Sequence, residues 1–212
     1  MVGCVMAILQ QLTGINFIMF YSNTLFASSG MSAQTITGLV GVVNFLSTFG
    51  GLFLLTIAGR RTIMVSCSII MSIILLLNGW SDLNGHDTFG IVTTMLFIAF
   101  FEFSSGPITW LYMAEIMQDK AVSLATVLNW IINLIISVIT PSLIKAIGDE
   151  NVGWIFIVMG GFTVAGTIFI IAFMKETRGK TAAEIEEMFM GGDGYSEKHM
   201  KRQLVAEKDS QF

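Results

Sequence analysis

Charged side chains are scarce in this chain, and their scarcity excludes most classes of soluble protein. Only 12% of the 212 residues are charged, whereas 54% are hydrophobic and the mean hydropathy is +0.75. Soluble domains carry about 25% charged residues, and half that share does not keep a surface of this size in water. Before residue 174 there are four basic residues: Arg60, Arg61, Lys120 and Lys145. This excludes a soluble enzyme, a nucleic-acid binder and a disordered protein for this part of the chain.

Residues that bind metals or perform catalysis are also rare. The two cysteines, Cys4 and Cys67, both fall in apolar runs and are too few for a disulfide framework or a metal site. We expect both to be buried structural thiols. Of the two histidines, His86 falls in a predicted loop and His199 in the C-terminal tail. No Ser/His/Asp, Cys/His or metal-ligand cluster is present in the sequence, so it predicts neither an enzyme nor a cofactor.

Long hydrophobic runs, by contrast, fill most of the chain. A helix needs about 20 mostly apolar residues to cross the hydrocarbon core of a bilayer. Six segments meet this requirement: 2–26, 36–57, 62–80, 89–117, 121–147 and 154–174. The short separators carry turn and charge signals, and the alternation typical of a transmembrane barrel is absent. We predict an all-α transmembrane protein, with a six-helix bundle over residues 1–174.

The positions of the basic residues predict the orientation of the bundle. Alternate loops place Arg60, Arg61, Lys120 and the seven basic residues after residue 174 on one side of the membrane. We therefore expect both termini to face the cytoplasm, with residues 175–212 forming a short cytoplasmic tail. An amphipathic stretch near residues 181–190 predicts a short helix that docks on the bundle or on lipid.

Polar residues within the spans are costly in hydrocarbon and therefore informative. The first span contains Gln10, Gln11, Thr13 and Asn16 around Gly14. Single amides in membrane helices often only bond a neighbouring helix, at about 0.6 kcal/mol. On a regular helix Asn16 would lie roughly 240° around the axis from Gln10. We predict local unwinding at Gly14, which would let the three amides point into one cavity.

Three further spans carry polar residues at helical spacing. Two stripes are formed by Asn44, Ser47 and Thr48 in the second span and by Thr126, Asn129 and Asn133 in the fifth. The fourth span holds Glu102, the one acid deep within a span, followed by Pro107 and Trp110. A proline breaks or kinks a helix, and broken membrane helices line cavities in transporters. Amides both donate and accept, which suits a neutral, hydroxyl-rich ligand such as a sugar, and an indole can cover its apolar face.

Five motifs resemble, in order, those of sugar porters of the major facilitator superfamily. They are Gln10–Asn16 with Tyr21, Ala58–Arg61, Glu102 with Gly106–Trp110 and Ala114-Glu115, Asn129-Trp130, and Lys175–Lys180. The resemblance covers nearly the whole chain and implies helices seven to twelve, the C-terminal half, of such a transporter. It implies transport of a sugar, a hexose such as glucose, by alternating access.

The resemblance also implies roles for individual residues. Those matching the sugar contacts are Gln10, Gln11, Asn16, Asn44, Glu102, Trp110 and Asn129. Those matching a cytoplasmic ion-pair network that closes the inner gate are Arg60, Arg61, Glu115 and Glu176. Oppositely charged residues at the inner membrane edge can separate and re-form as two bundles rock, which agrees with this role.

Four positions depart from the pattern that the resemblance implies. Thr56 stands where an acid is usual, and Lys175 replaces a proline. Thr109 replaces a second proline, which predicts a less broken tenth helix. The segment between Glu115 and Ser123 lacks the usual arginine, and Lys120 is the expected substitute.

Sugar porters hold substrate between two six-helix halves, and this chain resembles the second half alone. We expect a missing N-terminal six-helix half as a partner, besides the sugar and the lipid bilayer, and no nucleic acid. The plasma membrane is the expected location. Two other interpretations stay open: a sugar sensor that binds without transport, and a non-transporting membrane partner protein.

Overall fold

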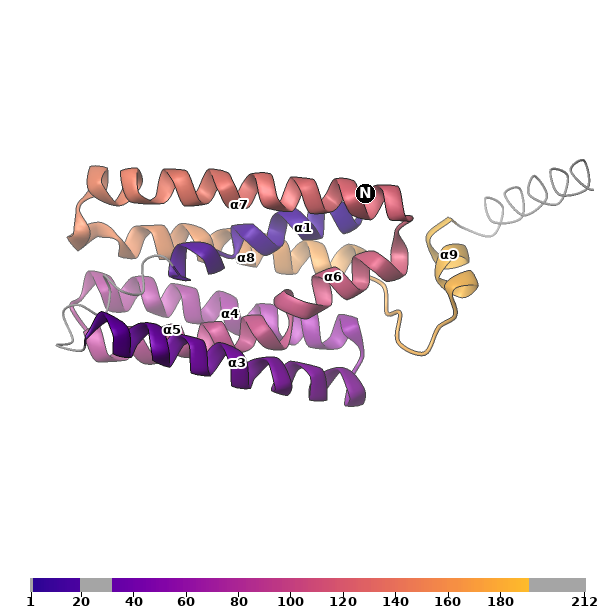
Figure 1. Cartoon of the computed structure of the whole chain (residues 1–212), viewed down its shortest axis with the longest axis horizontal. Coiled ribbons are helices and arrows are strands. Elements are labelled where there is room, and N and C mark those ends of the chain that lie inside the picture. Colours follow the sequence, from indigo (N-terminus) through magenta and orange to yellow (C-terminus); the bar gives the residue numbers. More distant parts are fainter. Residues whose placement is uncertain (1, 20–31, 191–212) are drawn as a thin grey trace, which may run out of the picture.

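The computed structural model describes residues 2–19 and 32–190 (Figure 1). Its helices are α1 (Val2–Leu12), α3 (Ala33–Ile57), α4 (Arg60–Leu83), α5 (Asp87–Phe103), α6 (Ser105–Ile116), α7 (Asp119–Ile147), α8 (Gly153–Phe173) and α9 (Ala182–Met190), with a 3₁₀ turn, η2 (Asp149–Asn151), before α8. Within these ranges six stretches are long and apolar enough to span a membrane. The prediction of an all-α, six-span protein is confirmed.

The first span is interrupted in its middle. α1 ends at Leu12, and helical structure resumes at Ile15 after a break at Thr13 and Gly14. Gly14 has a φ of +83°, a left-handed conformation that residues with a Cβ rarely adopt. The unwinding predicted at Gly14 is present in the structure, and residues 20–26 of the predicted span 2–26 lie outside the described part of the chain.

The fourth span is also broken, three residues ahead of its proline. α5 and α6 meet at Ser104, which has φ −133° and ψ −84°. Pro107 then falls in the first turn of α6, where backbone N–H groups have no intrahelical partner and a proline costs little. α6 runs without interruption through Thr109, the position of the absent second proline, so the break at Ser104 forms without that proline.

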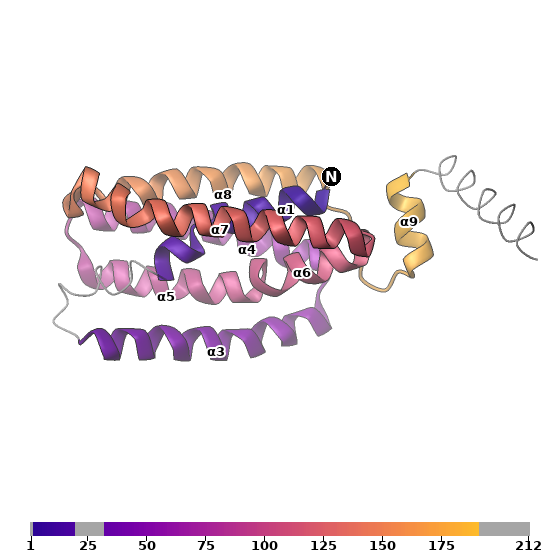
Figure 2. The same cartoon turned by 45° about the horizontal axis from the view of Figure 1, so that its top comes forward.

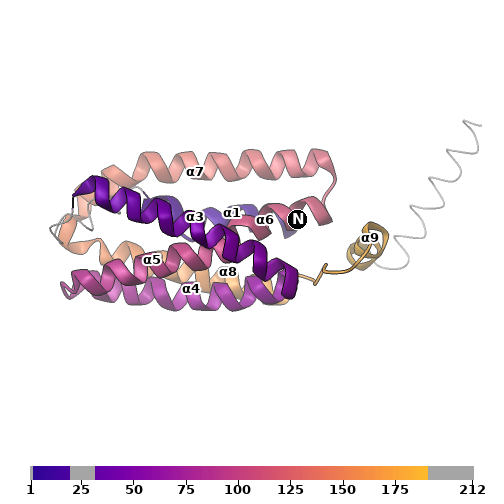
Figure 3. The same ribbon diagram turned by 60° about the horizontal axis from the view of Figure 1, so that its bottom comes forward.

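The spans form a bundle in which α7 and α3 lie at opposite sides (Figures 1 and 2). α7 packs on α1, α3 packs on α5, and α4 packs on both α5 and α8. Figure 3 shows α1 and α6 between α7 and the layer of α4 and α5. The two short helices next to the breaks therefore lie in the middle of the bundle, where polar groups are shielded from lipid.

Aromatic and aliphatic side chains fill the interior of this bundle. Phe17, just after the first break, meets Phe156 of α8 edge to face at 5.3 Å, and Leu75 and Phe97 are fully buried in the same cluster. Helices α3 and α7 contribute little to the core and expose large apolar side chains along their lengths. Such surface suits hydrocarbon or another membrane helix rather than water.

The tail docks α9 against the helix ends. Ile185 is buried, and Phe189 packs on the cluster that contains Met174 and Tyr112. Lys175 donates to the carbonyl of Met188 at 2.6 Å, and its ammonium lies 5.3 Å from the centre of the Phe189 ring. The lysine that replaces the usual proline thus fixes the C-terminal end of α9.

Candidate substrate site and helix-end network

A chain of side-chain amides runs across the unwound segment of the first span. Asn16 donates to Gln11 at 2.5 Å, Gln11 donates to Asn129 of α7 at 2.9 Å, and Asn129 donates to Gln10 at 2.8 Å. The break at Gly14 makes this possible, because it brings Asn16 to the same side as Gln11. The predicted gathering of the three amides is present in the structure, although as a network rather than an empty cavity.

Gln10 extends this chain to the second helix break. Its amide nitrogen donates to the carbonyl of Ser105 at 2.7 Å and to that of Gly106 at 3.3 Å. Asn129 also donates to the carbonyl of Ala7 at 2.8 Å. Both N–H bonds of Gln10 and of Asn129 are therefore used, and these side chains are 5% and 1% exposed.

A second polar cluster lies between α3 and α5. Asn44 donates to one carboxylate oxygen of Glu102 at 2.9 Å, and Thr48 contacts the other at 3.5 Å. All three side chains are half-buried. Two hydrogen bonds satisfy part of the carboxylate in a region where an unpaired charge would be costly.

The two clusters approach each other at Gly106 in the first turn of α6. The Gly106 carbonyl accepts from Gln10, and a Cβ added to Gly106 would lie 3.3 Å from the Glu102 carboxylate. Trp110, one turn further along α6, is half-buried against Ala7 and Ala125. The seven predicted sugar-contact residues therefore lie on α1, its continuation after the break, α3, α5, α6 and α7, around the two helix breaks.

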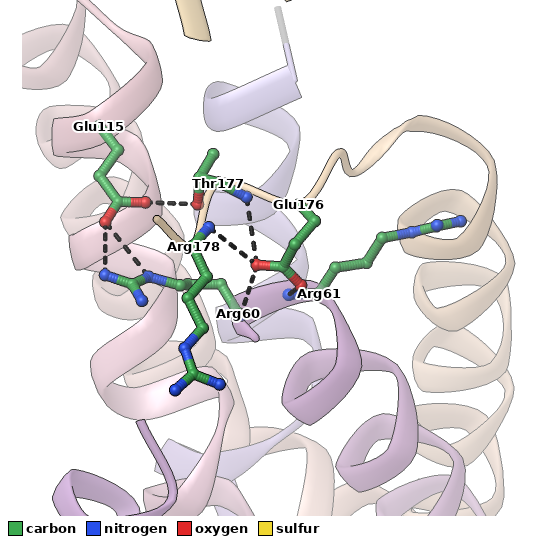
Figure 4. Close-up of polar contacts among 6 residues, drawn as sticks. All are labelled: Arg60, Arg61, Glu115, Glu176, Thr177 and Arg178. Carbon is green, nitrogen blue, oxygen red and sulfur yellow. Dashed lines mark hydrogen bonds and ion pairs between the residues drawn. The ribbon is translucent and has the colours of Figure 1, made fainter. Parts of the chain in front are cut away.

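The predicted gate residues meet at one end of the bundle (Figure 4). Arg60, at the start of α4, contacts Glu115, near the end of α6, through Nε at 3.2 Å and Nη2 at 3.0 Å. The two side chains form an ion pair, and each is about one fifth exposed. Thr177 donates its hydroxyl to the other Glu115 oxygen at 2.6 Å. The tail is thereby joined to the ion pair.

Glu176 acts as a helix cap rather than as the partner of an arginine side chain. Its carboxylate accepts the backbone N–H of Arg60 at 2.9 Å and that of Arg61 at 3.1 Å, at the N-terminus of α4 (Figure 4). The same carboxylate accepts the N–H groups of Thr177 and Arg178, both at 3.1 Å. A negative charge at a helix N-terminus satisfies orphan donors and complements the helix dipole.

Two arginines cap C-terminal helix ends in the complementary way. Arg61 donates to the carbonyl of Ile171 near the end of α8 at 2.8 Å. Arg178 donates to the carbonyls of Thr56 and Ile57, the last residues of α3, at 2.5 and 2.6 Å. Cations are favourable at these positions because the last carbonyls of a helix have no backbone partner. Thr56 stands where an acid is usual, and in this chain its backbone carbonyl accepts the hydrogen bond from Arg178.

Sequence reasoning missed three contributors and named one substitute residue that makes no contact with the network. Thr177 and Arg178 were not singled out, although both fall in the motif at Lys175–Lys180, and Ser105 contributes only a backbone oxygen. Lys120 is exposed and makes no hydrogen bond or ion pair within the described ranges, so it does not replace the absent arginine. Thr109 is fully buried, and its hydroxyl has no partner among the described residues.

The comparison with known families bears on this arrangement. The family described as "Sugar (and other) transporter" matches residues 1–189. The chain belongs to this sugar transporter family. It is therefore an integral membrane protein of a family of transporters rather than enzymes, and the resemblance found in the motifs is confirmed.

Relatives in the family differ in the sugar that their names give. The facilitated trehalose transporter Tret1-1 of Drosophila sechellia is 33% identical over 196 residues, which cover 86% of this chain and 22% of that protein. The facilitated glucose transporter member 3 of solute carrier family 2 from Mus musculus is 32% identical over 203 residues, 90% of this chain and 40% of that protein.

Solved structures of the major facilitator superfamily share the fold. The proton:xylose symporter XylE bound to 6-bromo-6-deoxy-D-glucose aligns with a TM-score of 0.80 and 25% identity, over 88% of this chain and 42% of the symporter. The chain thus spans less than half the length of these three proteins.

Proposed function

We propose that this chain forms the C-terminal six-helix half of a sugar transporter and supplies one wall of its sugar site. The observation that supports this most directly is the continuous amide network across the two helix breaks, from Asn16 to Ser105. Unwound helices at mid-membrane depth are where transporters hold substrate. Both termini of the chain would face the cytoplasm, in the plasma membrane.

Several residues of the two polar clusters have unused bonding capacity. Within residues 2–19 and 32–190, the carbonyl oxygens of Asn16 and Asn44 have no hydrogen-bond partner. Gln11 has one amide N–H without a partner in the same ranges, and Glu102 retains acceptor capacity. We propose that these groups form hydrogen bonds with the hydroxyls of the sugar and that Trp110 covers the sugar's apolar face. Gln10 and Asn129, whose N–H groups are used, hold the others in place and contact sugar through their remaining oxygen lone pairs.

A hexose such as glucose fits this set better than a charged solute. Deep within the described spans there is one carboxylate, Glu102, and it is already bonded to Asn44. The same region offers amides that both donate and accept. Sugar hydroxyls also do both, so each can replace a hydrogen bond that it lost to water.

Alternating access would use the helix-end network as its inner closure. Arg60 and Glu115 join α4 to α6, Thr177 joins the tail to Glu115 of α6, and Glu176 joins it to the start of α4. Charge-assisted bonds of this kind break and re-form as rigid bodies rock, since each pair lies at the aqueous edge of the membrane. A first half would form the opposite wall of the site and cover the apolar faces of α3 and α7.

Uptake into liposomes tests this function. The chain would be co-reconstituted with the six-helix first half of a related sugar transporter, and radiolabelled D-glucose uptake compared with that of L-glucose. We expect saturable uptake of the D-isomer with both halves present and none with either half alone. Stereospecific binding without uptake would instead support a sugar sensor. If the first half co-purifies with the chain but the pair shows neither binding nor uptake, the result would support a non-transporting partner protein.

A further inference from the structure

A recess opens between α7 and α8, next to the sugar site and apart from the helix-end network. Its volume is about 350 Å³, within the roughly 300–1,000 Å³ of pockets that bind small molecules. We call it the α7–α8 crevice. Its floor is formed by Gln11 and Leu12 of the first span, and its walls include Ile136 and Leu143 of α7 and Val158 and Met159 of α8.

The mouth of the crevice opens on the outside of the bundle. Leu143, Trp154, Val158 and Phe162 line it and are also exposed on the outside of the bundle, at 40–58% of their surface. The crevice is therefore continuous with an exposed apolar surface of the bundle, of the kind that suits hydrocarbon. Trp154 lies at the end where η2 joins α7 to α8, a level at which indole groups meet the membrane interface.

The lining selects for a hydrocarbon occupant. Nine of the ten lining residues are apolar, and the amide of the tenth, Gln11, is bonded to Asn129 and Asn16. A sugar or an ion would lose its hydration here without compensation. An empty apolar recess open to lipid would also forfeit dispersion contacts that an acyl chain supplies. We propose that the crevice binds one acyl chain of a membrane phospholipid, with the head group at the level of Trp154.

The floor of the crevice touches the unwound segment of the sugar site. The sulfur of Met159 occupies the space that a side chain at Gly14 would need, and Gln11 belongs to both the crevice and the amide network. An acyl chain seated against Met159 would hold this side chain against Gly14. The bound lipid would thus restrain the break on which the position of Asn16 depends.

Lipid retention measured by native mass spectrometry tests the proposal. The 212-residue chain would be stripped of lipid in detergent, exposed to dioleoyl phosphatidylcholine, and compared with Val158→Trp, which fills the crevice mouth. Val164→Trp is the matched control, because Val164 is also exposed on α8 but does not line the crevice. We expect the parent and V164W to retain one lipid that V158W retains severalfold less. Dihexanoyl phosphatidylcholine, with the same head group and short chains, should not replace it.

Other occupants give different results. Equal lipid retention in all three proteins would overturn the proposal. So would retention of the short-chain lipid, which would show head-group binding, or a dimer of the chain that V158W alone dissociates, which would show a second copy in the crevice. A fold check by circular dichroism ensures that V158W is compared as a folded protein.

Hydrogen exchange then tests the link to the unwound segment. We expect peptides that contain Thr13 and Gly14 to exchange more slowly in the lipid-loaded parent and V164W than after delipidation, and V158W to show no lipid-dependent slowing there. Lipid binding at the crevice with unchanged exchange of this segment would remove the proposed restraint on the break.

Discussion

Asn129 is the residue whose removal should disturb the proposed sugar site most. It is 1% exposed and makes three side-chain hydrogen bonds, to Ala7 and Gln10 as donor and to Gln11 as acceptor. Interhelical hydrogen bonds in membrane proteins contribute about 0.6 kcal/mol each, which gives about 2 kcal/mol for three. Asn129→Ala also leaves the amides of Gln10 and Gln11 short of partners, at a further cost of about 1–2 kcal/mol.

The matched control is Asn133→Ala, one turn along the same helix. Asn133 is half-buried, and its one contact with the network is a bond of 3.5 Å to Gln11. We expect its replacement to cost less than about 0.6 kcal/mol. Both variants would be unfolded by titration with SDS in mixed micelles, followed by far-ultraviolet circular dichroism. A free energy of unfolding that falls equally in both variants would refute the reasoning.

A double-mutant cycle separates the bond from the rest of the change. Gln10→Ala and Asn129→Ala remove the two ends of one hydrogen bond, so their effects on the free energy of unfolding should be less than additive. Additive effects would show that the two amides do not act as one network.

Three further predictions address other parts of the molecule. Gly51→Ala should destabilise the bundle by about 1–3 kcal/mol in the same titration, because its Cβ would lie 2.5 Å from the backbone oxygen of Glu102, whereas Gly38→Ala in the same helix meets nothing within 4 Å and should not destabilise it. In the reconstituted transporter Arg60→Ala should lower the maximal uptake rate more than the affinity for sugar, and loss of affinity at an unchanged maximal rate would show that Arg60 does not act at the gate. Hydrogen bonds from Thr181 at the start of α9 lower the pKa of Glu184 below 4.5. The stability that these bonds give α9 should therefore be present at neutral pH and lost as the pH falls through the lowered pKa. A carbon NMR titration that places the pKa of Glu184 at or above 4.5 would contradict this.

The spans and the polar residues within them could be predicted from sequence because both depend on local composition. The run of amides around Gly14 and the stripe that contains Asn129 are visible as polar residues where hydrocarbon penalises them. Their bonding partners are not visible, because the bond from Gln10 to Ser105 joins residues that are 95 positions apart and ends on a backbone oxygen. Sequence offers no signal for which carbonyl a distant side chain will reach.

The helix breaks and caps show the same limit. Pro107 indicated a break in the fourth span, yet the break falls at Ser104, because a proline is tolerated in the first turn of a helix. Glu176 was expected to pair with an arginine and instead accepts backbone N–H groups of α4. Its charge identified Glu176 as important. A carboxylate can pair with a basic side chain or with the N-terminus of a helix, and only the fold decides between these two partners.

Equilibrium binding of D-glucose to the assembled two-half transporter tests the central claim most directly, since the claim is that the polar wall of this chain holds the sugar. Gln11→Ala and Asn44→Ala should each weaken binding by about 1–3 kcal/mol, or roughly 5- to 150-fold, because a sugar hydroxyl loses its partner in a site shielded from water. Arg60→Ala should leave the affinity close to that of the parent. Affinities within about twofold of the parent for both amide variants would contradict the account.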